Sequence, residues 1–599
     1  MKASTYEPVW DLEVIYSNGS DSKELEQDLI LLVTEINQFK KSIHLLGTPQ
    51  SPNEIGEVAS IIDQFTKLAK KIRQAGAFIS CLQAQDTTDK KAGLLQGKLT
   101  SLSAQFQMAI TTLEEFFASI SEIVWKLLLE SERLSDISFV LNEIRERSKS
   151  KLEVQQEVLI QSLSVDGYHG WSHLYDKIVA KIKIPLAENG ETKELSVGQA
   201  FNKFSSADRS IRKQVFESWE TAWRNESDLL THTLNHLSGY RLNVYKARGW
   251  DDILFEPLTY NRMDKKTLET MWQVISENKQ PFVDYLNRKA DLLGLDQLSW
   301  YDLDAPLGKT ESTVTYQEGA EFILEQFGRF GKELPSFTER AFKERWIEAE
   351  DRPNKRPGGF CTSFPESEQS RIFMTFSGTP SNVSTLAHEL GHAFHQHAMR
   401  DVHPMNQRYA MNVAETASTF AEMIVADASV KFANNKEERL ALIEDKLQRS
   451  VALLMNIHAR FLFETAFYEE RKNGLVSTER LNELMENAQK EAYCDALSDY
   501  HPEFWGSKLH FYITGVPFYN FPYTFGYLFS LGIYAKALEE GGEFETKYIA
   551  LLKDTGSMKV EELAMKHLGV DLTERDFWDN AVKLAVSDVD EFLTLTEES

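Results

Sequence analysis

The chain has few cysteines and no long apolar run, and each shortage excludes a class of protein. Its 599 residues include only 3 cysteines, at positions 81, 361 and 494. An odd number of widely separated cysteines predicts free thiols in a reducing compartment and argues against a disulfide-rich scaffold. No stretch of 18 apolar residues is present, and residues 1–10 lack the apolar run of a secretory signal. We therefore expect a cytoplasmic protein without a membrane partner.

Positive charge is also scarce. The chain has 65 Lys and Arg against 91 Asp and Glu, a formal net charge of −26, which disfavours nucleic acid and anionic membranes as partners. Such a surface mainly favours solubility, although its field could also draw cationic peptides toward a site. With 42% hydrophobic and 26% charged residues, the composition is that of an ordinary globular protein.

Linkers and repeats are not visible in the sequence. Amphipathic helical patterns run from Ser22 nearly to the C-terminus without a Pro/Gly/Ser linker or a low-complexity tract. Examples are residues 25–39, 55–79, 438–471 and 479–497. The sequence thus predicts a mostly α-helical protein built from closely packed subdomains.

One break divides the helical pattern. Residues 180–197 contain two alternating runs separated by Asn189-Gly190, which predicts a β-hairpin with a type I′ turn. We therefore expect a helical N-terminal region, residues 1–199, that ends in this hairpin, and a second region, residues 200–599, that carries the motif described next.

The motif is His388-Glu389-Leu390-Gly391-His392. On a helix the i and i+4 positions share one face, so both imidazoles can bind one tetrahedral ion while Glu389 points toward a water. The apolar residues around the motif indicate a buried helix. A core helix with two hydrogen-bonded histidines is the alternative, but burying these polar groups without a cation is costly. The motif therefore favours a zinc hydrolase.

A catalytic zinc site needs a third protein ligand, and two candidates follow the motif. Glu415 lies in a second apolar segment, in which small residues at 414, 417, 418 and 421 would allow a close approach to the first helix. Glu422, seven residues later, shares its face. His395 extends the motif by two turns from His388, too far for a compact tetrahedron, so a second-shell or substrate-facing position fits it better. Spacing favours Glu415, with His395 as the alternative third ligand.

Two β-prone segments precede the motif. Residues 358–364 and 370–376, separated by polar residues 365–369, predict a second hairpin. An edge strand beside a metal can bind an extended peptide through its backbone, although a purely structural ribbon fits the pattern equally well. Asn382 is the predicted N-cap of the motif helix.

An aromatic segment, residues 509–527, follows near the C-terminus and is interrupted by Gly and Pro. By itself it favours an aromatic core. A zinc peptidase, however, needs hydrogen-bond donors for the oxyanion that forms at the scissile carbonyl, and a histidine with several tyrosines provides such donors.

These segments together resemble a known family, the thimet-oligopeptidase-like zinc metallopeptidases, and within it the bacterial oligoendopeptidase F branch. The resemblance covers nearly the whole chain: residues 10–16, 181–197, 356–360, 388–395, 414–422, and His510 with residues 517–523. It implies His388, His392 and Glu415 as zinc ligands and Glu389 as general base. It further implies His510, Tyr519 and Tyr523 as oxyanion donors, and Gly358, Gly359, Phe360 and Tyr527 as substrate-binding residues. We expect His395 and Glu422 in the second shell from their positions on the two helices.

The resemblance also implies a fold and an activity. We expect a mostly α, clamshell-like zincin with a small hairpin next to the motif helix, enclosing a deep channel that admits only oligopeptides. One Zn²⁺ per chain would serve an endopeptidase. A carboxypeptidase or aminopeptidase with the same chemistry, or a non-catalytic peptide-binding protein on the same fold, are the alternatives. A di-iron bundle is disfavoured because we find no second Glu-x-x-His in the chain.

Overall fold

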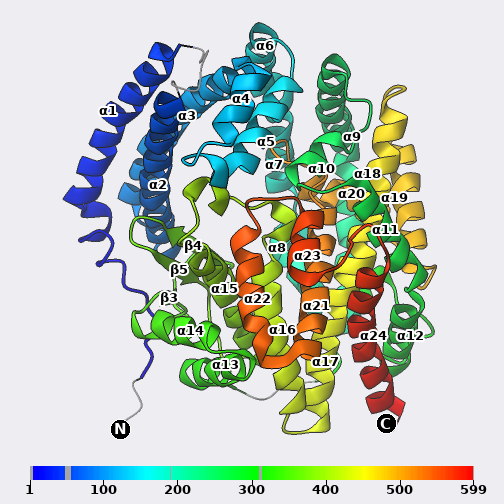
Figure 1. Ribbon diagram of the computed structural model, residues 1–599. Helices are drawn as coiled ribbons and strands as arrows, with labels where there is room; N and C mark the ends of the chain where they lie inside the picture. Colours follow the sequence, from blue (N-terminus) through cyan, green and yellow to red (C-terminus); the bar gives the residue numbers. More distant parts are fainter. Residues whose placement is uncertain (1–4, 48–54, 189, 309–312, 598–599) are drawn as a thin grey trace.

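The computed structural model describes residues 5–47, 55–188, 190–308 and 313–597, and these form a mostly helical protein (Figure 1). Helices account for 71% of the residues and strands for 4%. The predicted mostly α-helical fold class is confirmed. No helix in the described ranges has both the length and the apolar character needed to cross a membrane.

The N-terminal part is a stack of amphipathic helices. Helix α1 begins after Ser22, whose hydroxyl accepts a hydrogen bond from the Leu25 amide, and it buries a stripe at Leu25, Leu29, Leu32 and Ile36. The helices of this part are α1 (Lys23–Leu45), α2 (Ile55–Gln85), α3 (Lys90–Ser119), α4 (Glu122–Leu129), α5 (Ser138–Lys149), α6 (Val154–Ser164) and α7 (Gly170–Lys181).

The first predicted hairpin is confirmed. Strands β1 (Ile184–Glu188) and β2 (Glu191–Leu195) pair antiparallel, with Ile184 opposite Leu195. Gly190 has φ +81°, a conformation that glycine adopts without strain. Asn189 lies outside the described residues, so the predicted turn type stays a prediction.

Helices dominate again after the hairpin. The next are α8 (Val197–Asn202), α9 (Arg209–Arg248), α10 (Phe255–Tyr260), α11 (Lys265–Glu277), α12 (Gln280–Leu292), α13 (Tyr316–Phe330) and α14 (Glu333–Lys343). A short strand region follows, with β3 (Ile347–Glu348), β4 (Phe360–Phe364) and β5 (Gln369–Phe373). The remaining helices are α15 (Pro380–Ala398), α16 (Thr416–Lys431), α17 (Lys436–Val451), α18 (Ile457–Arg471), α19 (Thr478–Tyr493), α20 (Phe504–Ser507), α21 (Phe521–Glu540), α22 (Phe544–Asp554), α23 (Val560–Leu568) and α24 (Asp576–Glu597).

The three-stranded sheet lies between the two parts of the molecule. Its strand order is β3-β5-β4, with β5 parallel to β3 and antiparallel to β4, so β4 is an edge strand. The predicted second hairpin is confirmed. Helices α2 and α15 both pack against it (Figure 1).

Two hydrophobic cores support this arrangement. The N-terminal core collects residues from Trp10 to Leu141 and also takes in Phe364 and Phe373 of the hairpin. The larger core extends from Tyr175 to Phe592. The hairpin therefore ties the N-terminal helices to the motif helix α15. The predicted boundary at residues 199 and 200 stays a prediction.

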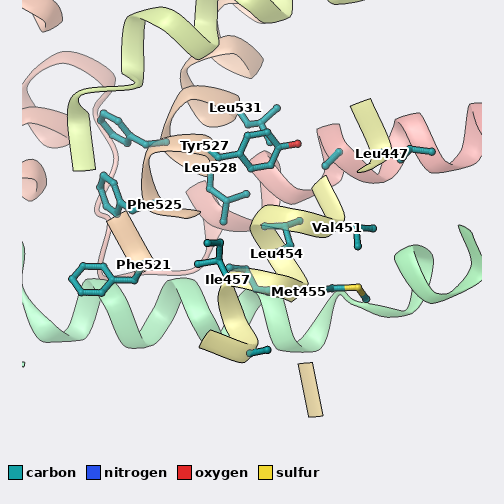
Figure 2. Packing of buried hydrophobic residues seen from close by; sticks show 14 of the residues in the cluster. Leu447, Val451, Leu454, Met455, Ile457, Phe521, Phe525, Tyr527, Leu528 and Leu531 are labelled. Carbon is teal, nitrogen blue, oxygen red and sulfur yellow. The ribbon is translucent and has the colours of Figure 1, made fainter. Parts of the chain in front are cut away.

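Helix α21 packs into the larger core (Figure 2). Its Leu528 lies beside Leu454 and Ile457, which lie on and beside a π-helical turn at Ala452–Asn456. This turn divides the helix expected over residues 438–471 into α17 and α18. The helix expected over residues 479–497 ends earlier, at Tyr493, because Cys494 adopts φ +55° and caps it.

Candidate metal centre

Helix α15 carries the motif, and its start differs from the prediction. The N-cap is Thr379, not Asn382. Asn382 is the third helical residue and closes a capping box: the Thr379 hydroxyl accepts from the Asn382 amide, and the Asn382 side chain accepts from the Thr379 amide. Pro380 at the first helical position explains the shift, since proline is well tolerated there.

Helix α16 approaches α15 very closely, as the small residues predicted. A Cβ atom at Gly391 would lie 2.4 Å from the Ala417 carbonyl oxygen and 2.6 Å from the Ser418 Cα. Only glycine therefore allows this contact. Glu415 is the residue immediately before α16, so the close approach also brings its carboxylate to the motif.

The three predicted ligands come together. In the described part of the chain, His388, His392 and Glu415 form the only group whose donor atoms could hold a metal ion, all within 4.8 Å of one another. Glu415 Oε2 lies 3.2 Å from His388 Nε2 and 3.4 Å from His392 Nε2. A tetrahedral ion with bonds of about 2.0–2.1 Å separates its ligands by roughly 3.3 Å. The three donors thus fit zinc in both type and spacing.

Further side chains orient these donors. Glu422 Oε2 lies 2.9 Å from His388 Nδ1, so the Nδ1–H can donate to Glu422 and leave Nε2 free for a metal. Arg449 forms an ion pair with the other oxygen of Glu422. The Ser418 hydroxyl donates to Glu415 Oε2 at 2.7 Å. Sequence reasoning missed Arg449, which lies 27 residues after Glu422 and carries no motif.

The electrostatics of the site favour a cation. Burial opposes charging of the His388 ring, but hydrogen bonds to Glu415 and Glu422 outweigh it and raise the pKa of His388 to about 10. Burial likewise raises the pKa of Glu415, yet hydrogen bonds from both motif histidines bring that pKa well below its usual range. The carboxylates thus stabilise positive charge between them.

Glu389 is buried beside this group but does not join it. Its side chain is 7% exposed, and its Oε2 has no hydrogen-bond partner among the described residues. Burial raises the pKa of Glu389, while His392 and His388 oppose that rise. A Cβ atom at Gly359, just before β4, would lie 3.2 Å from Glu389 Oε1. A buried carboxyl with an unpaired oxygen can accept a hydrogen bond from a water or a substrate that binds transiently.

His395 lies elsewhere. It is fully buried, its Nε2 contacts the Thr555 hydroxyl at 2.9 Å, and its ring stacks on Tyr409 with centroids 4.2 Å apart. Burial, followed by the influence of His392, lowers the pKa of His395 to about 3, so the ring is neutral. These contacts favour a packing role and give no support to His395 as the third ligand.

The aromatic segment brings three predicted residues together. The ring centroids of His510 and Tyr519 are 5.2 Å apart, those of His510 and Tyr523 are 6.0 Å apart, and those of the two tyrosines are 5.6 Å apart. Burial raises the pKa of Tyr523, with smaller contributions from Tyr519 and from the charge of Glu415. The group is therefore within electrostatic range of the candidate metal centre.

Arg460 of α18 determines which nitrogen of His510 carries the proton. Its Nη1 lies 2.9 Å from His510 Nδ1. A guanidinium has only donors, so Nδ1 must accept and the proton of the neutral ring lies on Nε2. Burial, Arg460 and Lys508 together lower the pKa of His510 to about 4, so the ring is neutral at pH 7. Sequence reasoning missed Arg460, because no local pattern links it to a residue 50 positions away.

The predicted substrate-binding residues divide into two groups. Gly358 and Gly359 are exposed at the start of β4, and Phe360 is half-buried and stacks on Phe373. Tyr527 is 7% exposed in the core and its hydroxyl contacts Ser450 at 2.8 Å (Figure 2). The structure thus gives no support to a substrate-binding role for Tyr527, because its hydroxyl is already paired inside the core.

A helical fold that holds a His-Glu-x-x-His helix against a glutamate defines a metal-dependent hydrolase. The family described as Peptidase family M3 matches residues 204–584, and the description Oligopeptidase F matches residues 117–184. The chain belongs to peptidase family M3. The predicted membership is confirmed, and with it the predicted class of enzyme, a metallopeptidase.

Relatives extend over almost the whole chain. An oligoendopeptidase F homolog of Lactococcus lactis subsp. lactis is 24% identical over 98% of this chain and 97% of its own. The group B oligopeptidase PepB of Streptococcus agalactiae is 26% identical over 96% and 95%. Oligopeptidase PepF of Bacillus subtilis is 23% identical over 98% and 87%.

Solved structures share the fold. One from Chlamydophila abortus aligns with a TM-score of 0.85 at 21% identity, covering 98% of both chains. The oligoendopeptidase-F of Enterococcus faecium aligns with a TM-score of 0.70 at 19% identity, covering 97% of this chain and all of that one.

Proposed function

We propose that this chain is a zinc-dependent endopeptidase that hydrolyses internal bonds of oligopeptides. The observation that carries the proposal is the spacing of the three donors, 3.2 and 3.4 Å from Glu415 to the two motif histidines. This spacing matches the edge of a zinc tetrahedron, roughly 3.3 Å. The names of the relatives, oligoendopeptidase F and oligopeptidase, support peptides as the substrate class.

In this proposal the metal and Glu389 share the chemistry. Zinc, held by His388, His392 and Glu415, would polarise the scissile carbonyl and activate a water. Glu389 accepts the proton of the attacking water and delivers it to the leaving amine. Its burial raises its pKa, which makes it a better base than an exposed carboxylate. Its unpaired Oε2 leaves an acceptor free for the water.

The aromatic group supplies donors for the oxyanion. His510 Nε2 carries a proton because Arg460 occupies Nδ1, and no described residue accepts a hydrogen bond from Nε2. Tyr519 and Tyr523 pack against His510 and against each other, so their hydroxyls are further candidate donors. Donors that are already oriented stabilise developing charge without reorganising.

The edge strand β4 is proposed to hold the substrate. Gly359 at its start lies against Glu389, so a peptide paired with β4 would pass the general base. Backbone pairing of this kind is independent of side chains and suits an enzyme of oligopeptides. The three cysteines are all free thiols, which fits the expected reducing, cytoplasmic compartment.

The test is Glu389→Gln. We expect the variant to retain zinc and lose nearly all turnover, because the ligands survive and only the base is removed. Metal analysis combined with hydrolysis of a mixed peptide library, read by mass spectrometry with and without a chelator, measures both quantities. Internal cleavage positions distinguish an endopeptidase from the exopeptidase alternatives. Near-normal kcat in the variant, or no cleavage by the zinc-loaded protein, would refute the proposal.

A further inference from the structure

A cavity of about 310 Å³ lies where β4 ends, and basic side chains surround it. Lys70 and Arg73 of α2, Arg400 after α15, and Arg408 line this cavity, against a single carboxylate, Glu368. We call these four basic residues the basic cluster. It contrasts with the net charge of −26 for the chain.

Most of the basic cluster has no acidic partner. Among the described residues, the side chains of Lys70, Arg73 and Arg408 form no ion pair or hydrogen bond, whereas Arg400 lies 3.8 Å from Asp401 and donates to the His397 carbonyl oxygen. Loss of solvation lowers the pKa of Arg408, and the nearby charge of Arg73 lowers it further. His397 adds no charge, because burial lowers its pKa to about 4. Four basic side chains around a cavity that holds one carboxylate, Glu368, favour the binding of an anion.

Strand β4 connects this cavity to the candidate metal centre. Gly359, at the start of the strand, lies against Glu389, and Ser363 and Phe364, at its end, line the cavity. Ser363 follows Gly359 by four residues, about 13 Å of extended chain at roughly 3.3 Å per residue. Cys361 lies between these two ends of the strand. Burial raises the pKa of its thiol, the charge of Glu389 raises that pKa further, and the charge of Arg73 lowers it. The strand therefore lies within the influence of both Glu389 and Arg73.

We propose that the basic cluster is a subsite for a carboxylate of the peptide substrate, about four residues from the bond that is cleaved. The proposal rests on the proposed function, since a peptide that pairs with β4 and passes Glu389 carries its fourth residue to the cavity. The carboxylate can come from an Asp or Glu side chain or from the C-terminus of a short peptide. Arginine recognises carboxylates through paired hydrogen bonds, and the rigid strand sets the distance between recognition and cleavage.

The test measures peptide binding to the zinc-loaded Glu389→Gln protein, which does not depend on turnover. Labelled twelve-residue peptides of one sequence carry a single Glu that replaces Gln at successive positions, each with a C-terminal acid or amide. Their Kd values are measured by fluorescence anisotropy. Cleavage by the unmodified enzyme locates the scissile bond in each peptide.

We expect Glu to improve Kd about tenfold over Gln at one position, about four residues from the scissile bond, as for a charged hydrogen bond. Arg73→Gln and Arg408→Gln, each combined with Glu389→Gln, should remove most of that preference. Lys67→Gln is the matched control, because Lys67 is exposed on the same helix and does not line the cavity. A preference for the C-terminal acid over the amide, with no Glu preference, would identify the terminus as the source.

Equal Kd values for all Glu/Gln and acid/amide pairs would overturn the proposal, as would a preference that survives both arginine substitutions. The proposed function fails separately, if the unmodified zinc-loaded enzyme cleaves no peptide. The binding comparison still decides the subsite in that case, because it needs no cleavage.

Discussion

Gly391→Ala should weaken the candidate metal centre without touching any ligand. A Cβ atom at this position would lie 2.4 Å from the Ala417 carbonyl oxygen and 2.6 Å from the Ser418 Cα. Ordinary contacts between such atoms are about 3.5 Å, so α15 and α16 must separate by roughly 1 Å. Glu415 moves with α16, and its 3.2 Å distance to His388 then exceeds the ligand spacing of a zinc tetrahedron.

We expect Gly391→Ala to lower both the free energy of unfolding and the affinity for zinc. Overpacking of this kind destabilises a protein by about 1–3 kcal/mol. Displacing the residues that orient metal ligands lowers metal affinity by about 10–100-fold. Thermal unfolding of the metal-free protein measures the first effect, and zinc competition with a chromogenic chelator measures the second.

Gly328→Ala is the matched control. Gly328 lies in α13, and a Cβ atom there meets nothing within 4 Å. Because alanine is the better helix former by up to about 1 kcal/mol, this variant should keep its zinc affinity and be at least as stable. An unchanged zinc affinity and melting temperature in Gly391→Ala would refute the packing argument.

Two further predictions concern the metal ligands and the aromatic group, and a third concerns Glu464, a buried carboxyl of α18. Glu415→Ala should lower zinc affinity far more than His395→Ala, since the first removes a ligand and the second a packed ring; the reverse order of the measured affinities would contradict this ligand set. His510→Ala and Tyr523→Phe should lower kcat and kcat/KM together by about 10²–10³ with zinc content unchanged, and a fall in melting temperature alone would assign both residues to the core. Burial raises the pKa of Glu464 to about 8 from the usual 4.5, so the fold loses stability as pH rises between those values. Glu464→Gln should therefore be more stable than the unmodified protein at pH 9 but not at pH 5, as thermal melts in matched buffers will show; equal differences at both pH values would contradict it.

Local patterns in the sequence determined much of the fold. The helical periodicity of residues 25–39 and 55–79 and the alternating runs around Gly190 predict elements that the structure contains. These signals are local, because hydrogen bonding and side-chain periodicity depend on neighbours a few residues apart. Predicted ends were less accurate: Thr379 rather than Asn382 caps α15, since the choice between two capping residues three positions apart depends on where Pro380 enters the helix.

The motif by itself predicted that His388 and His392 share one helix face and that Glu389 points differently. The sequence offered both Glu415 and His395 as candidates for the third ligand, and the tertiary structure favours Glu415. Close packing at Gly391 brings Glu415 to the histidines, whereas His395 turns to Thr555.

Long-range contacts were beyond the reach of sequence patterns. Arg460 meets His510 across 50 residues, Arg449 meets Glu422 across 27, and the basic cluster unites α2 with residues more than 300 positions later. Each of these side chains looks like an ordinary surface charge in its own segment. Only the packing of distant helices decides which charges are brought together, because that packing is a property of the whole core and not of any local segment.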